Sequence, residues 1–195
     1  ALRLISCGQT GSKEKQKEAK KSDTVENKNA VDSNNNKFPE NTSLTTIDTA
    51  GTSNVAQMVS GIRHEVERIN ALRLYRKEVR FVCDAENTIT YYTHNSRVVK
   101  IIIEWGFVGD GSSKYEYYYK KGKLIFTFKV HVGGPAGLPQ TKIEERTYVD
   151  NDKTIKYMKN QKVTACSVCQ FTESSKEYKA LNAYAKNNVK ALLCN

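Results

Sequence analysis

In the middle of the chain, apolar and polar side chains alternate with a period of two, in runs that short turn signals separate. The clearest run lies between the turn signal Lys121-Gly122 and the Gly/Pro segment 133–140. It places these apolar residues on one face: Leu124, Phe126, Phe128, Val130 and Val132. Successive side chains of a strand point to opposite faces of its sheet, so this period predicts a strand.

Shorter runs with the same period lie on both sides of it, at 89–93, 98–105, 115–119, 143–149 and 155–157. Turn signals at 94–96 and 150–152 separate some of them, and the glycine-containing segment 106–113 is interpreted as a loop. Short connections restrict consecutive strands to antiparallel pairing. The sequence therefore predicts a five- to six-stranded antiparallel meander.

Two amphipathic helices are predicted to flank the meander. The first has a single apolar stripe at helical spacing, formed by Val55, Met58, Val59, Ile62, Val66 and Ile69. Asn54 is its expected N-cap. Before the second helix, Ser174 and Glu177 have the spacing of a capping box, and Tyr178 and Leu181 follow at helical spacing. The predicted fold class is α+β: a helix, the meander, and a C-terminal helix packed on the sheet.

The first fifty residues differ in composition from the remainder. Of the 31 basic and 21 acidic residues, 8 and 7 fall in 1–50, so 51–195 carries +9 of the net charge of +10. Segment 8–50 has few aliphatic side chains and cannot bury enough apolar area to offset its ordering entropy. We therefore expect a disordered tether at 8–50 and a single α+β domain at 51–195.

The tether follows Leu4-Ile5-Ser6-Cys7, which resembles a bacterial lipobox, in which a small residue precedes the lipidated cysteine. Residues 1–7 are then the remnant of a signal peptide, with lipid on Cys7. No apolar run reaches the ~18 residues needed to span a bilayer. This interpretation places the protein at the bacterial cell envelope, anchored to a membrane and facing the periplasm or the outside. The alternative is an ordinary free cysteine in a flexible N-terminus.

The four other cysteines are candidates for disulfides: Cys83, Cys166, Cys169 and Cys194. An exported protein would oxidise them, and four cysteines allow three pairings. Cys166 and Cys169 form a CxxC before a predicted helix, whose dipole would lower a thiol pKa, so thiol redox chemistry is the alternative. The βαβ unit and the following proline of thioredoxins are missing. Zinc would need a second pair of ligands, so no metal site is predicted.

No acid–base centre is evident. His64, His94 and His131 show no triad pattern, and the chain is predicted to be neither an enzyme nor a cofactor binder. Tyrosines and lysines interleave at 115–124, which predicts a ligand face formed by Tyr118, Lys120, Lys129 and His131. An anionic glycan, lipid or protein surface is the expected partner. Single-stranded nucleic acid is the alternative, although an exported protein meets little of it.

Two segments carry a family resemblance: Tyr117-Tyr118-Tyr119-Lys120-Lys121-Gly122-Lys123-Leu124-Ile125-Phe126 and the run 145–157. They resemble uncharacterised exported lipoproteins of Bacteroidetes-type bacteria, and their strand-and-turn pattern resembles MORN-like β-hairpin repeats. The resemblance implies an exported, anchored protein and supplies no catalytic residues. The expected function is a non-catalytic, lipid-anchored binding or structural module. A thiol-disulfide redox protein and a polyanion binder are the alternatives, and the oligomeric state stays open.

Overall fold

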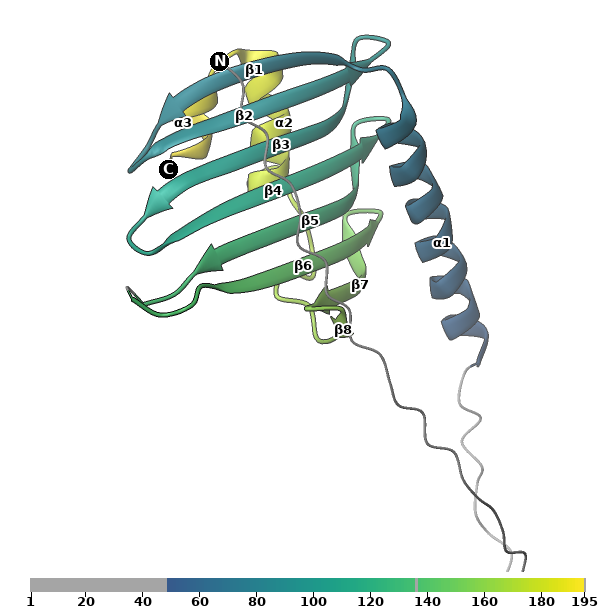
Figure 1. The fold of residues 1–195 in the computed structure, drawn as a ribbon. Helices are drawn as coiled ribbons and strands as arrows, with labels where there is room; N and C mark the ends of the chain where they lie inside the picture. The colour runs from purple at the N-terminus through teal and green to yellow at the C-terminus, as the bar shows by residue number, and fades with distance from the viewer. Residues whose placement is uncertain (1–48, 136, 195) are drawn as a thin grey trace, which may run out of the picture. The chain divides into compact units, whose positions relative to one another are not determined.

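The computed structural model describes residues 49–135 and 137–194 (Figure 1). Cys7, segment 1–7 and nearly all of the predicted tether 8–50 lie outside the described residues. A long helix precedes an eight-stranded antiparallel sheet, and two short helices follow it. The elements are α1 (Thr49–Ala71), β1 (Tyr75–Val82), β2 (Glu86–His94), β3 (Arg97–Val108), β4 (Gly111–Lys120), β5 (Lys123–Gly133), β6 (Thr141–Asp150), β7 (Lys153–Lys159), β8 (Lys162–Val163), α2 (Lys176–Lys186) and α3 (Val189–Leu193).

Each strand pairs with its neighbours in sequence, so the predicted antiparallel meander is confirmed. Four of its hairpins turn through two residues that both have positive φ: Asn95-Ser96, Lys121-Gly122, Asn151-Asp152 and Asn160-Gln161. Two-residue turns of this kind match the right-handed twist of the flanking strands. Three of the four coincide with the turn signals expected from the sequence.

The sheet is larger than predicted. The edge strand β1 was not expected, because only Val79 and Phe81 give its inner face an apolar alternation, which is too short a signal. β8 adds only two residues. The segment 106–113, expected to be a loop, is mostly strand, because β3 continues to Val108 and β4 begins at Gly111.

Helices α2 and α3 pack on one face of the sheet, here called the α2 face, and lie behind the strands in Figure 1. Ala180 and Ala183 of α2 are fully buried, and Val189 and Leu193 of α3 join them. The sheet contributes these fully buried residues: Ile89, Ile101, Ile103, Tyr117 and Tyr119. Small alanines allow α2 to lie close to the sheet, which accommodates the bulky tyrosines opposite them.

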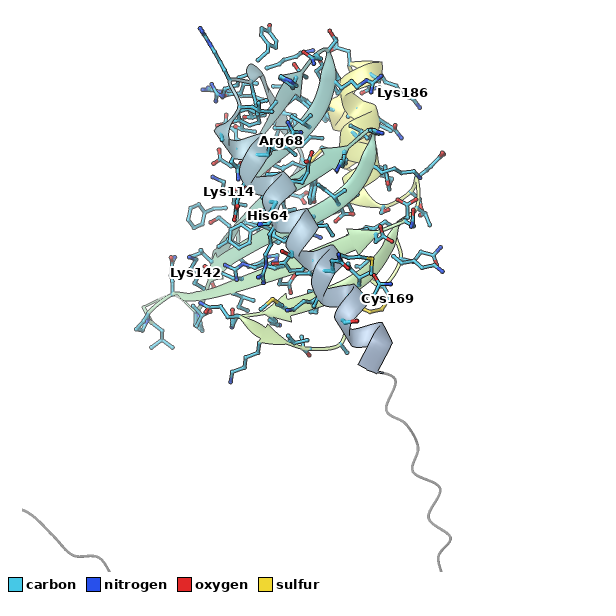
Figure 2. All side chains as sticks on the ribbon, turned by 90° about the vertical axis from the view of Figure 1, so that its right-hand side faces the viewer. His64, Arg68, Lys114, Lys142, Cys169 and Lys186 are labelled. Carbon is cyan, nitrogen blue, oxygen red and sulfur yellow. A yellow bond between two sulfur atoms is a disulfide. The ribbon has the colours of Figure 1, made fainter. Side chains whose placement is uncertain are left out.

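Helix α1 packs on the opposite face, the α1 face, and lies along one end of the sheet (Figures 1 and 2). Its buried Val59 and Ile69 contact a cluster that includes Tyr118, Phe126 and Tyr148 of the sheet. The predicted apolar stripe therefore forms this contact. No helix in the described part of the chain is long and apolar enough to cross a membrane.

Two of the sheet's β-bulges change which face residues of the predicted strands occupy. Val99 has no partner on β2, so Val98 joins the α2-face core and Val99 faces α1. A second bulge at Ile125 leaves Leu124 on the α2 face while Phe126 lies on the α1 face. A bulge inserts one residue and shifts the alternation beyond it. The expectation that Leu124 and Phe126 share a face was therefore wrong.

The helix ends also differ from prediction. Asn54 lies inside α1 rather than at its N-cap. The N-cap of α2 is Ser175, and the capping box of Ser174 and Glu177 does not form, because the Glu177 side chain is buried in an ion pair. Asn187, with φ of 49°, ends α2, so two short helices replace the single one expected.

Asp152 connects the β6–β7 turn to two other parts of the domain. Its carboxylate accepts a hydrogen bond from Lys123 Nζ at 2.7 Å and another from the Tyr178 hydroxyl of α2. Lys123 first and Tyr178 second lower the pKa of Asp152. The ionised carboxylate therefore stabilises the fold.

We expect Asp152→Asn to lower the free energy of unfolding by about 1 kcal/mol at neutral pH. Asparagine tolerates the positive φ of this position, so the turn itself is preserved. Because folding lowers this pKa, the Asp152 carboxylate stabilises the fold fully above its unfolded-state pKa of about 4. This stabilisation is lost as pH falls through the folded-state pKa. Urea unfolding of both proteins should show a difference in free energy of unfolding at pH 7 that decreases as pH falls below about 4. A difference that persists in acid would contradict this role.

Candidate functional site

A groove of about 440 Å³ is lined by residues of β3 to β6, around the turn between β3 and β4. This turn lies at the end of the sheet away from α1 (Figure 1). Cross-strand pairing on β3 to β6 builds it from two rows of residues. The inner row is Trp105, Ser113, His131 and Ile143, and the outer row is Gly111, Gly133 and Thr141. Its volume falls within the roughly 300–1,000 Å³ of small-molecule sites.

Three polar side chains on neighbouring strands form a chain beside this groove. Ser113 Oγ lies 2.9 Å from His131 Nδ1, within hydrogen-bond distance. His131 Nε2 lies 4.0 Å from Glu145 Oε2, too far for a direct hydrogen bond. If the Ser113 hydroxyl donates to Nδ1, the neutral imidazole carries its proton on Nε2. The side chains of His131 and Glu145 are 37% and 20% exposed, so solvent reaches both.

One wall of the groove is aromatic. Trp105 makes edge contacts with Phe81 and Tyr115, at centroid distances of 5.8 and 6.2 Å. Lys176, the first residue of α2, places its Nζ 5.2 Å from the Trp105 ring centroid. Tyr115 also makes an edge contact with His131 at 5.4 Å. These contacts fix the indole beside the polar chain.

Gly106 holds β3 against β2 next to Trp105. A Cβ atom at this position would lie 2.2 Å from the carbonyl oxygen of Glu86, so only glycine fits. The Gly106 N–H donates to the buried Asn87 side chain at 3.0 Å. The wall of the groove therefore rests on a close backbone approach that a side chain would disrupt.

An ion pair lies behind the groove, between the sheet and α2. Lys129 Nζ is 2.8 Å from Glu177 Oε1, and the Glu177 side chain is only 4% exposed. The ammonium also lies 5.3 and 5.8 Å from the ring centroids of Tyr115 and Tyr117. Glu177 therefore compensates the Lys129 charge inside the protein. Burial, and then the Glu177 charge, raise the pKa of the Tyr117 hydroxyl.

The ligand face predicted from the sequence does not form one surface. Cross-strand register pairs Lys129 with Tyr115, which puts Lys129 and His131 on the α2 face. Tyr118 lies on the α1 face, with its hydroxyl donating to Glu116 at 2.8 Å. Lys120 lies 3.9 Å from Glu65 of α1. Of the four predicted residues, only His131 lines the groove.

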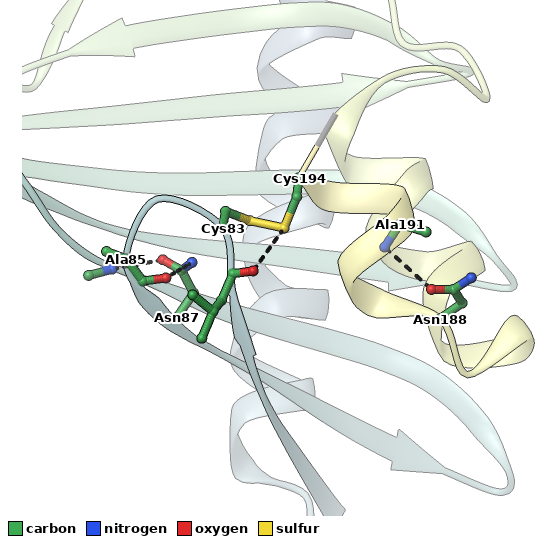
Figure 3. The surroundings of a disulfide bond; sticks show 8 residues. Cys83, Ala85, Asn87, Asn188, Ala191 and Cys194 are labelled. Carbon is green, nitrogen blue, oxygen red and sulfur yellow. Dashed lines mark hydrogen bonds between the residues drawn. A yellow bond between two sulfur atoms is a disulfide. The ribbon is translucent and has the colours of Figure 1, made fainter.

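All four cysteines of the described region are in disulfides. Cys83, after β1, is bonded to Cys194, after α3, with an S–S distance of 1.99 Å (Figure 3). This bond joins the end of the chain to the first hairpin of the sheet. Cys166 is bonded to Cys169 in the segment between β8 and α2.

The CxxC pair does not lie at a helix N-terminus, contrary to the reasoning that favoured redox chemistry. α2 begins only at Lys176, and the segment after the pair instead hydrogen-bonds to the start of β7. Thr154 N donates to Cys169 O at 2.9 Å, and Phe171 N donates to Asp152 O at 2.8 Å. The helix dipole that would lower a thiol pKa is therefore absent from this pair.

The contact of His131 with Ser113 was not predicted from the sequence. His64 on α1 and His94 at the end of β2 do not line the groove. Ser113, His131 and Glu145 resemble a nucleophile–base–acid set only superficially. In that set Nε2 faces the serine and Nδ1 donates to the acid, the reverse of this arrangement. Catalysis also needs donors for an oxyanion, commonly at turns or helix starts. Ser113 instead lies in a strand paired on both sides. The arrangement suits hydrogen bonding to a bound molecule.

Within 49–135 and 137–194, no group of three or more His, Cys, Asp or Glu side chains is arranged to hold a metal ion. Comparison with protein-family models, curated proteins and solved structures found no match for this chain.

Proposed function

We propose that this protein is a non-catalytic binding module, held at the bacterial cell envelope by a lipid on Cys7. The observation that carries the binding role is the groove, where hydrogen-bonding side chains of Ser113 and His131 lie beside the Trp105 wall. Open sites with an apolar lining and a few placed polar groups are typical of small-ligand binding.

Two further features support export and argue against the alternatives. Disulfides persist in oxidising compartments, and this domain has two of them. A polyanion binder needs uncompensated cations on one face, whereas Lys120 and Lys129 lie on opposite faces, each beside a glutamate. A thiol-redox protein needs an activated thiol, which the position of the CxxC pair does not favour.

The anchor is tested by metabolic labelling with an alkyne-bearing palmitate in a bacterial host that expresses the full gene. We expect the wild-type protein to be labelled and to sediment with membranes. Cys7→Ser should be unlabelled and soluble, because lipid is the membrane attachment. The double variant Cys166→Ser/Cys169→Ser is the matched control and should keep its label. An unlabelled wild type, or a labelled Cys7→Ser, would refute the anchor.

A further inference from the structure

We propose that the groove binds a saccharide, with one sugar hydroxyl bridging His131 Nε2 and Glu145 Oε2. The proposal rests on the binding function above and adds the class of ligand. It follows from the hydrogen-bond donors and acceptors of Ser113, His131 and Glu145, and from the apolar wall beside them.

The 4.0 Å separation of His131 Nε2 and Glu145 Oε2 fits one inserted oxygen atom. An oxygen at hydrogen-bond distance of about 2.8 Å from both atoms would subtend an angle near 90–95°, close to that of a hydroxyl. In the tautomer that the bridge requires, the Ser113 hydroxyl, 2.9 Å away, donates to Nδ1, so that Nε2–H donates outward. The bridging group must then accept from Nε2 and donate to the Glu145 carboxylate.

A single hydroxyl oxygen can do both. A ligand carboxylate or phosphate at this position would face the Glu145 charge, and Lys129 on the same face is already paired with Glu177. An ammonium group cannot accept from Nε2. A purely apolar ligand would offer no hydrogen bond to His131 Nε2 or to Glu145 Oε2. A hydroxyl is therefore the group that fits between His131 and Glu145.

The remainder of the groove favours a ring with an apolar face. Trp105 and Ile143 stand at the two ends of the inner row, and Val108 adds an apolar side chain at the rim. Beside them, Gly111 and Gly133 pair directly, so this part of the groove is lined by backbone atoms alone. Sugar rings combine C–H faces, which pack on such walls, with hydroxyls at the edge.

The experiment uses the chain's only tryptophan, Trp105, as the reporter. Chitohexaose, cellohexaose, maltohexaose and mannohexaose are titrated separately into the full-length protein, up to about 10 mM. At least one should change the Trp105 emission with saturation. Glu145→Ala and His131→Ala should each weaken that binding about tenfold or more, because each removes one hydrogen bond of the bridge.

Glu144→Ala is the matched control, because the adjacent Glu144 points to the opposite face and pairs with Lys142 and Arg146. It should leave saccharide affinity unchanged, and thermal melts establish that each variant is folded. Equal losses of saccharide affinity in Glu144→Ala and Glu145→Ala would overturn the proposed bridge. No change in Trp105 emission with any of the four sugars would overturn the saccharide assignment. Native mass spectrometry of protein from its host then separates the two proposals. A retained non-sugar molecule leaves the binding function standing, whereas no ligand of any kind removes both.

Discussion

Replacing Cys194 with serine is expected to lower the free energy of unfolding by about 3–4 kcal/mol. The Cys83–Cys194 bond closes a loop with a sequence separation of 111, so its loss frees all of the described chain after β1 in the unfolded state. Chain-entropy arguments set an upper value of about 5 kcal/mol for such a loop. Leu193, the neighbour of Cys194, is buried against the α2-face core, so α3 should detach first.

The matched control removes the other disulfide. Cys166 and Cys169 are only three residues apart, so the double variant Cys166→Ser/Cys169→Ser frees little chain. Its loss in free energy of unfolding should be smaller than that of Cys194→Ser by at least about 2 kcal/mol, as measured by guanidinium unfolding of the two variants. Equal losses would show that the Cys83–Cys194 bond does not constrain the domain as described.

Glu177→Gln should lower the free energy of unfolding by about 3 kcal/mol. The substitution leaves the Lys129 ammonium between the sheet and α2 without its partner at 2.8 Å. A buried charge without compensation is costly, and the 21% exposure of the Lys129 side chain moderates that cost without removing it. The measurement is urea unfolding near neutral pH.

The double variant Lys129→Met/Glu177→Leu tests the origin of this loss. Apolar side chains of similar size often replace a buried ion pair without net cost. We expect the double variant to be more stable than Glu177→Gln by about 2 kcal/mol or more. If the double variant is no more stable than Glu177→Gln, the unpaired Lys129 charge is not the cause of the loss.

Much of the fold could be predicted because its signals are local. Turn residues such as Asn151-Asp152 and Lys121-Gly122 determine where strands reverse, and the stripe of α1 follows from its helical spacing. The edge strand β1 could not be predicted with the same ease. It alternates apolar residues on one face for only a few positions, and its outer face is charged.

The groove was beyond the sequence because it depends on register across strands. Counting residues outward from the Lys121-Gly122 turn would pair Ser113 with Val130. The bulge at Ile125 shifts β5 by one residue and pairs Ser113 with His131 instead. Nothing in the local sequence marks this bulge. The same shift separates Tyr118 from Lys129, which is why the predicted ligand face is divided between the two faces of the sheet.

The most direct test of the account is to locate the ligand on the protein by NMR. The single indole N–H resonance of Trp105 and the backbone amides are followed as the tightest-binding of the four oligosaccharides is added to ¹⁵N-labelled full-length protein. Saccharide binding in the groove should cause saturable shifts at Trp105, Ser113, His131 and Glu145, with little change on the α1 face near Phe128 and Arg146. Shifts confined to the α1 face, or none at any amide, would contradict it.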